Sequence, residues 1–98
     1  MNFISDEQIT IADTAIGLTV PDTAYRCFIE IWTASIYFSL DGDTPSSSNG
    51  GRASPGDTIN LMGSENRPMR DNMKSIMLKL KMLRQGSTSA LGIVHYFD

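Results

Sequence analysis

Few residues of this chain carry side chains that could act as a nucleophile, a base or a metal ligand. It has one histidine, His95, and one cysteine, Cys27. One of each cannot build a zinc site without carboxylate ligands, and the Gly-x-Ser-x-Gly turn of many serine hydrolases is absent. Both residues stand among alternating apolar positions, so we expect a structural histidine and a small buried cysteine. A single cysteine also excludes an internal disulfide.

Two short motifs could bind an ion, but each lacks part of its pattern. The Asp-Gly-Asp motif at 41–43, followed by hydroxyl side chains, offers oxygen atoms to calcium, yet the closing glutamate of a calcium loop is missing. The Gly-Gly-Arg motif at 50–52 suggests a phosphate-binding loop, yet the Lys-Ser/Thr pair and the following helix are missing. We therefore predict a flexible surface loop, no metal, no cofactor, no small-molecule substrate and no enzymatic activity.

Length and composition indicate one domain, residues 1–98. The chain has 98 residues, of which 41% are apolar, enough for one modest core. A core of that size favours association of copies, so we expect a homo-oligomer. The N-terminus has no basic and apolar signal-peptide pattern, and no apolar run approaches the ~20 residues of a membrane helix. We expect a protein that is made in the cytoplasm and has no membrane partner.

Charge is divided unevenly along the chain. Residues 1–66 carry nine acidic and two basic side chains, a net charge of −7, whereas residues 67–84 carry six basic and one acidic, a net charge of +5. This split is typical either of a solvated face or of a surface that complements an acidic partner or another copy. The acidic remainder would repel phosphates, which argues against nucleic acid. The predicted contact residues are Arg52, Arg67, Arg70, Lys74, Lys79, Lys81 and Arg84.

Alternating apolar residues predict the strands that would position these side chains. We expect strands over residues 8–12, 15–20, 24–32, 36–40, 58–62 and 90–97. In the third of these, Phe28 and Trp32 lie on the face opposite Cys27. Two aromatic residues on that more polar face indicate that it too is covered, by a second sheet or by another copy of the chain.

Residues 68–85 fit two structures. A helix is indicated by Pro68 near its start, Gly86 after its end and an apolar stripe that includes Met73 and Leu80. A strand over 76–83 is indicated by the alternation of Ile76, Leu78, Leu80 and Met82, and we favour the strand. The segment 41–56 reads as one long polar loop that begins at an Asp-Gly turn, and 1–7 as an N-terminal arm. Short strands between Gly, Pro and Ser clusters predict an all-β fold, a small antiparallel sandwich or barrel of immunoglobulin-like or jelly-roll-like type.

A resemblance rests on the segment 37–61 and the C-terminus. Tyr-x-Ser-Leu-Asp-Gly-Asp-Thr-Pro at 37–45, the Ser-rich spacer, Gly-Asp-Thr-Ile-Asn-Leu at 56–61 and the terminal Val-His-Tyr-Phe at 94–97 are similar to a group of small tailed-phage virion proteins. The Tyr-x-x-Asp-Gly-x-x-Pro core also resembles the immunoglobulin-like module of chitobiase-type bacterial enzymes. The phage resemblance covers 26–97, but residues 67–85 depart from it.

The phage resemblance implies a non-enzymatic virion protein, located in the particle, that decorates or cements the capsid by binding the major capsid protein or other virion proteins. The segments 2–7, 46–55 and 67–84 are the expected contacts. A head–tail adaptor or another tail component is the nearest alternative. The second resemblance implies an accessory carbohydrate-associated module, for which Trp32 and Tyr37 would be the aromatic platforms.

Overall fold

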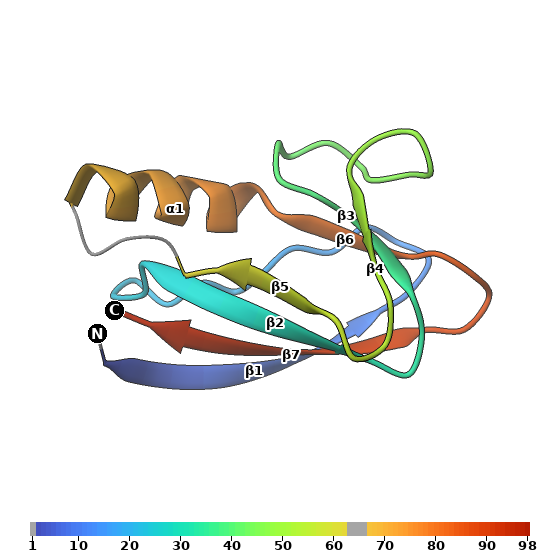
Figure 1. The fold of residues 1–98 in the computed structure, drawn as a ribbon, viewed down its shortest axis with the longest axis horizontal. Helices are drawn as coiled ribbons and strands as arrows, with labels where there is room; N and C mark the ends of the chain where they lie inside the picture. The colour runs from blue at the N-terminus through green and yellow to red at the C-terminus, as the bar shows by residue number, and fades with distance from the viewer. Residues whose placement is uncertain (1, 63–66) are drawn as a thin grey trace.

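The fold is a sandwich of two antiparallel sheets with one helix (Figure 1). The structure, a computed structural model, describes residues 2–62 and 67–98. Sheet A has the strand order β1-β7-β2-β5 and sheet B the order β4-β3-β6, which confirms the predicted all-β antiparallel sandwich. The elements are β1 (Phe3–Ile11), β2 (Arg26–Trp32), β3 (Ile36–Ser39), β4 (Gly51–Ala53), β5 (Thr58–Leu61), α1 (Arg67–Lys79), β6 (Lys81–Arg84) and β7 (Ala90–Phe97).

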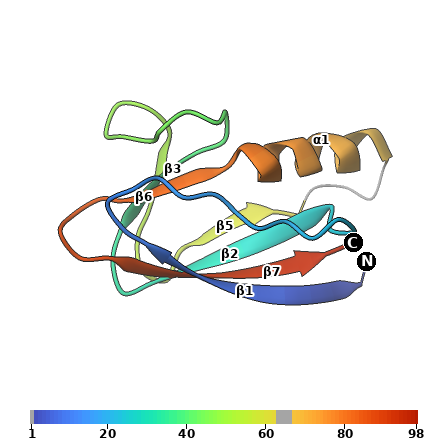
Figure 2. The same cartoon turned by 180° about the vertical axis from the view of Figure 1, so that it is seen from behind.

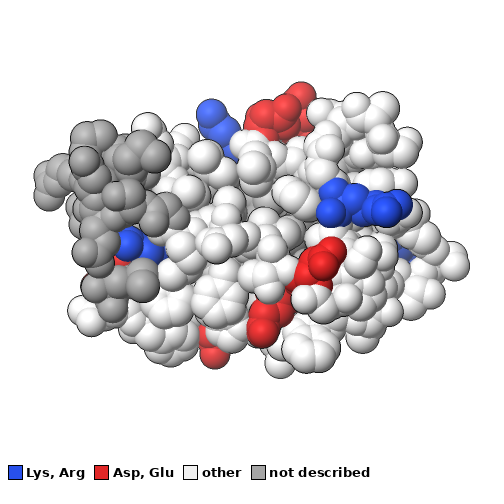
Figure 3. Space-filling view, in the orientation of Figure 1, with Lys and Arg blue, Asp and Glu red and all other residues white. Residues whose placement is uncertain are grey.

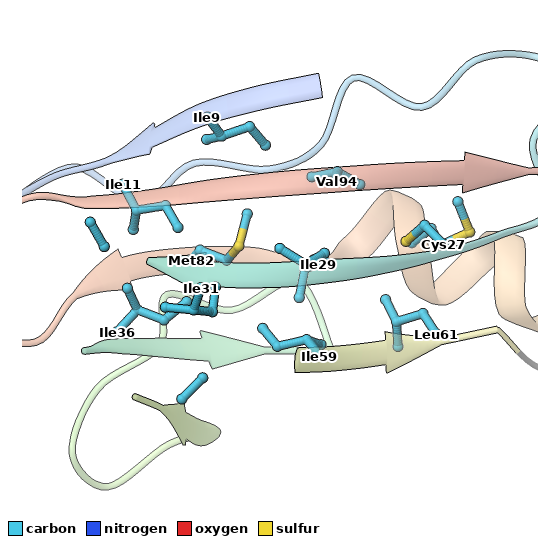
Figure 4. Close-up of a cluster of buried hydrophobic side chains, with 14 of the residues drawn as sticks. Ile9, Ile11, Cys27, Ile29, Ile31, Ile36, Ile59, Leu61, Met82 and Val94 are labelled. Carbon is cyan, nitrogen blue, oxygen red and sulfur yellow. The ribbon is translucent and has the colours of Figure 1, made fainter. Parts of the chain in front are cut away.

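The core lies between the sheets and is built from one face of each strand. The side chains of Cys27, Ile29 and Ile31 in β2 are fully buried, and so is the side chain of Val94 in β7. They meet Ile36 and other apolar side chains of sheet B (Figure 4). The buried cysteine is confirmed, and burial raises the pKa of its thiol to about 12. Such a thiol is inert in the folded protein.

Helix α1 and sheet B lie on the same side of sheet A (Figures 1 and 2). The helix turns Met73, Ile76 and Met77 toward the core, and Leu80, directly after its end, continues the same spacing of three and four residues. Met77 and Leu80 are fully buried. The inner surface of sheet A is therefore covered by a mixed layer, a three-stranded sheet at one end and a helix at the other.

The favoured strand over 76–83 is wrong for its first half. Residues up to Lys79 are helical, and the Leu80 backbone N–H donates to the Ile76 carbonyl in the last helical turn. Only Lys81–Arg84 pairs with β3, as strand β6. Leu80 is buried and fits both patterns. It lies three residues after Met77, as on a helical face, and two residues before Met82, as on one face of a strand. The predicted helix is therefore correct up to this point, although it does not extend to 85.

The predicted strand at 15–20 does not form. Ile16 exchanges two backbone hydrogen bonds with Met82, of 2.9 and 2.8 Å, and this isolated bridge is the whole pairing. The partner strand β6 begins at Lys81, so residues beyond Ile16 meet the end of the helix rather than a strand edge. Leu18 and Val20 still pack against the core, which explains their alternation.

Two further expectations about segments are corrected. The segment 1–7 is not an arm, because β1 starts at Phe3 and pairs with β7 from Phe3 onward. The segment 41–56 is not one flexible loop, because strand β4 lies inside it and Pro45 is buried. Gly51 packs against the ring of Phe38, where an added Cβ would lie 2.7 Å from the ring. Glycine is needed there for close approach.

Two glycines of this segment provide a matched test. Gly42 has a φ of +89° with open space around a built Cβ, whereas Gly50 has a φ of +107° and its Cβ would lie 2.1 Å from the Phe38 carbonyl oxygen. We expect Gly42→Ala to lower the free energy of unfolding by about 1–2 kcal/mol, from backbone strain alone. Gly50→Ala should cost about 2–5 kcal/mol, because overpacking adds to the strain. Urea titration of both variants measures the difference, and equal costs would mean that the Gly50–Phe38 contact is absent.

Candidate functional site: the outer face of sheet A

The face of sheet A that points away from sheet B and α1 is the candidate site. Alternation along β7 buries Val94 and Tyr96 and places His95 and Phe97 on the opposite, half-exposed side. The pairing registers of β1, β2 and β5 then define which residues share that side. We call this set the outer face: Phe3, Asp6, Gln8 and Thr10 of β1, Leu91, Ile93, His95 and Phe97 of β7, Arg26, Phe28, Glu30 and Trp32 of β2, and Thr58 and Asn60 of β5.

Aromatic rings dominate one end of the outer face. Phe28 stacks on Phe97, with ring centroids 5.9 Å apart, and Phe97 meets Phe3 edge to face at 5.8 Å. Such pairs add to the stability of a sheet and fix its register. Phe3 nevertheless remains 57% exposed, so this cluster is only partly covered by its own neighbours.

The other end of the outer face carries Trp32, which is 48% exposed beside Leu91. The next residue, Thr33, has a φ of 74° and sits in a tight turn in which the Ala34 backbone N–H donates to the Trp32 carbonyl at 2.9 Å. The Thr33 hydroxyl donates to the same carbonyl at 2.6 Å and accepts from the Leu91 N–H at 3.2 Å. Three hydrogen bonds therefore fix the backbone that presents the indole.

A charged row crosses the middle of the outer face. His95 Nδ1 lies 2.5 Å from an Asp6 carboxylate oxygen, and Nε2 lies 3.0 Å from a Glu30 carboxylate oxygen. The Phe28 ring stacks on the imidazole at 4.5 Å. The hydrogen bond that the ring donates to Glu30, followed by the one to Asp6 and the two negative charges, holds the pKa of His95 above its ordinary value, against the opposing effect of partial burial. Sequence alone indicated a structural histidine but not its partners.

On the inner side of the same strands, the carboxylate of Glu7 accepts two structural hydrogen bonds. Glu7 accepts the Tyr96 hydroxyl at 2.5 Å and the Thr19 backbone N–H at 3.2 Å. Burial, and then the bonded carboxylate, raise the pKa of Tyr96. These contacts join β1, β7 and the segment between β1 and β2, so they fasten that segment to sheet A.

The predicted basic contact residues whose side chains the structure describes lie on different elements. Lys79 is exposed at the end of α1, Lys81 and Arg84 lie in β6, and Arg52 is exposed in β4 opposite Tyr37. The side chains of Arg67 and Arg70 lie outside the described residues. Figure 3 shows the described Lys and Arg groups of one side of the molecule as separate islands, with uncharged surface and acidic groups between them. Their role in binding stays a prediction.

Lys74 has a defined place inside the molecule. Its ammonium lies over the Tyr25 ring, 4.6 Å from the centroid, and donates to the carbonyl oxygens of Pro21 and Asp22. These contacts fasten α1 to the turn that precedes β2. Lys74 is therefore an internal clamp, in which the ammonium group contacts other residues of the same chain.

Two hollows with partly apolar linings lie beside β4, the edge strand of sheet B. One, of about 380 Å³, lies between Ile76 and the chain around Phe38 and Leu40. The other, of about 410 Å³, runs between β4 and β5 and shares the same two residues. Neither hollow is lined by the histidine or the cysteine of the chain.

Other kinds of site receive no support within residues 2–62 and 67–98. No group of three or more His, Cys, Asp and Glu side chains there is placed to hold a metal ion. None of the helical segments in that part of the chain has the length and apolar character to cross a membrane. Comparisons with models of protein families, with curated proteins and with solved structures found no match.

The two lysines of α1 provide a test of the internal clamp. We expect Lys74→Ala to lower the free energy of unfolding by about 1–3 kcal/mol, because it removes hydrogen bonds from a charged group and the contact with the Tyr25 ring. Lys79→Ala, at an exposed position of the same helix, should change it by less than about 0.5 kcal/mol. Thermal unfolding of the two variants gives the comparison. Equal effects would show that the clamp contributes nothing.

Proposed function

We propose that this chain is a non-enzymatic structural protein of a bacteriophage virion, a decoration or cement protein that binds neighbouring capsid subunits through the outer face of sheet A. The observation that carries the proposal is the exposure of that face. Sheet B and α1 cover one side of sheet A, and the aromatic residues of the other side have no covering layer among the described residues.

Contact chemistry supports a docking role for the outer face. Exposed apolar patches rimmed by polar side chains are typical of protein interaction sites, and aromatic residues are enriched in such interfaces. Phe3 and Trp32 stand at opposite ends, with Leu91, Ile93, Phe28 and Phe97 between them. A preformed sheet surface loses little backbone conformational entropy on binding, because the hydrogen-bonded ladder already holds its backbone.

The resemblance to tailed-phage virion proteins supplies the kind of partner. It rests on the tyrosine strand and Asp-Gly-x-x-Pro turn, at 37–45, and on the closing Val-His-Tyr-Phe strand. The closing strand is β7, which contributes four residues to the outer face. A decoration protein that binds as an oligomer engages several lattice sites at once, so a modest surface on each copy is sufficient through multivalency.

Recovery of the chain in purified particles tests the proposal. Virions from a lysate of the strain that carries the gene are purified by density gradient and probed with an antiserum to the recombinant protein. We expect the protein to co-sediment in a copy number comparable to that of the major capsid protein. A few copies per particle would favour the head–tail adaptor instead, and complete absence from particles would contradict any virion role.

Exposed apolar residues inside and outside the outer face provide a matched test of the docking surface. Trp32→Ser should reduce occupancy of the particle at least about tenfold, because aromatic anchors carry much of an interface's energy. Leu78→Ser, at a residue of α1 that is 63% exposed, should leave occupancy unchanged. Occupancy is measured by quantitative mass spectrometry of particles that lack the protein and are incubated with each variant. The reverse pattern would place the interface on α1.

A further inference from the structure

The charged row on the outer face joins three strands through one imidazole. By register, His95 of β7 lies directly opposite Asp6 of β1 and opposite Phe28 of β2. Glu30 is two residues farther along β2 and reaches the other ring nitrogen diagonally. Both nitrogens of the ring are therefore within hydrogen-bond distance of a carboxylate, one on each side of β7.

The protonation state of the His95 imidazole decides whether its contacts with Asp6 and Glu30 are both hydrogen bonds. An ionised carboxylate only accepts hydrogen bonds, and a neutral imidazole has a single N–H. Both contacts of His95 are therefore attractive only when the ring carries two protons. After loss of one proton, a nitrogen lone pair faces a carboxylate oxygen at 2.5 or 3.0 Å, and that contact becomes repulsive.

The surroundings of the ring favour its charged form without enclosing it. Phe28 stacks on the ring and interacts favourably with a cation, and the row holds two carboxylates but no lysine. On β7 itself the neighbours on this face are the apolar Ile93 and Phe97, and on β1 the next residue is the neutral Gln8. Arg26, opposite Phe97, is the cation of the adjacent row. The His95 side chain is 22% exposed, so protons exchange with solvent.

We propose that His95 is a proton-controlled latch, which as an imidazolium ties the edge strand β1 and the strand β2 to β7, and which releases the start of β1 when it loses a proton. The start of β1 is the part that can respond. It is an edge segment, it contains an irregularity of register between Phe3 and Ser5, and among the described strands it pairs with β7 alone. The latch is a property of the isolated chain and does not depend on the proposed virion partner.

The pH range of the latch follows from the direction of the shift. The pKa of His95 is raised in the folded chain, by Glu30 and then by Asp6. The stabilising contribution is therefore complete below the ordinary histidine value of about 6.5 and is lost as pH rises through the higher folded value. The partners are 51% and 39% exposed, so solvent screens the pair and the effect is modest.

Nuclear magnetic resonance of the ring tests the latch directly, because the chain has one histidine. At pH 6.5, long-range ¹H–¹⁵N spectra should show two protonated ring nitrogens, with the transition to a single N–H at higher pH. Over the same transition, hydrogen-exchange protection of the Ser5 and Asp6 amides should fall about two- to five-fold, the range of an exposed ion pair. Protection of Ile29 and Val94 should stay constant.

Variants separate the latch from a general effect of pH. In Glu30→Gln the ring should lose its proton at a lower pH than in the wild type, whereas Asp13→Asn, at an exposed carboxylate elsewhere, should leave the transition unchanged. In His95→Gln the pH dependence of Ser5 and Asp6 protection should disappear. A single N–H at pH 6.5 in the wild type would overturn the proposal. So would a pH-dependent loss of protection that survives in His95→Gln.

Discussion

The register of β7 between β1 and β2 is the constraint on which the rest of the molecule depends. Side chains alternate across a strand with a period of two, so pairing fixes which half of β7 enters the core. Val94 and Tyr96 point inward, where Val94 joins the packed interior and Tyr96 bonds Glu7. A slip of β7 by one residue would turn His95 into the core, away from its two carboxylate partners, and would expose Val94. The pairing of β7 with β1 and β2 therefore determines both which residues form the core and which form the outer face.

The charged row contributes to that register as well as depending on it. Asp6, His95 and Phe28 meet only when β1, β7 and β2 are aligned as observed. Cross-strand contacts of this kind contribute little individually, but they penalise alternative registers in which like groups would meet. The aromatic contacts from Phe3 to Phe28 act in the same way at one end of the face. A surface that serves docking can thus also help to specify the fold.

Local patterns predicted much of this architecture, and long-range contacts explain what they missed. The strands at 24–32 and 90–97 alternate clearly, and β2 and β7 follow them closely. The partners of His95 lie 89 and 65 residues away along the chain, so spacing in the sequence gives no sign of them. The same holds for Lys74, whose contact with the Tyr25 ring cannot be inferred from the spacing of the two residues in the sequence. At Leu80 the helical and the alternating patterns overlap, and tertiary packing determines that α1 ends at Lys79 and that β6 begins at Lys81.

Quenching of tryptophan fluorescence measures the central claim most directly, because the chain has one tryptophan, Trp32, and it stands on the outer face. In the isolated chain a small neutral quencher such as acrylamide should reach the indole, in keeping with its 48% exposure. On binding to particles, the quenching constant should fall several-fold and the emission should shift to shorter wavelength. If the chain binds particles while Trp32 remains as accessible as before, the outer face of sheet A is not the docking surface.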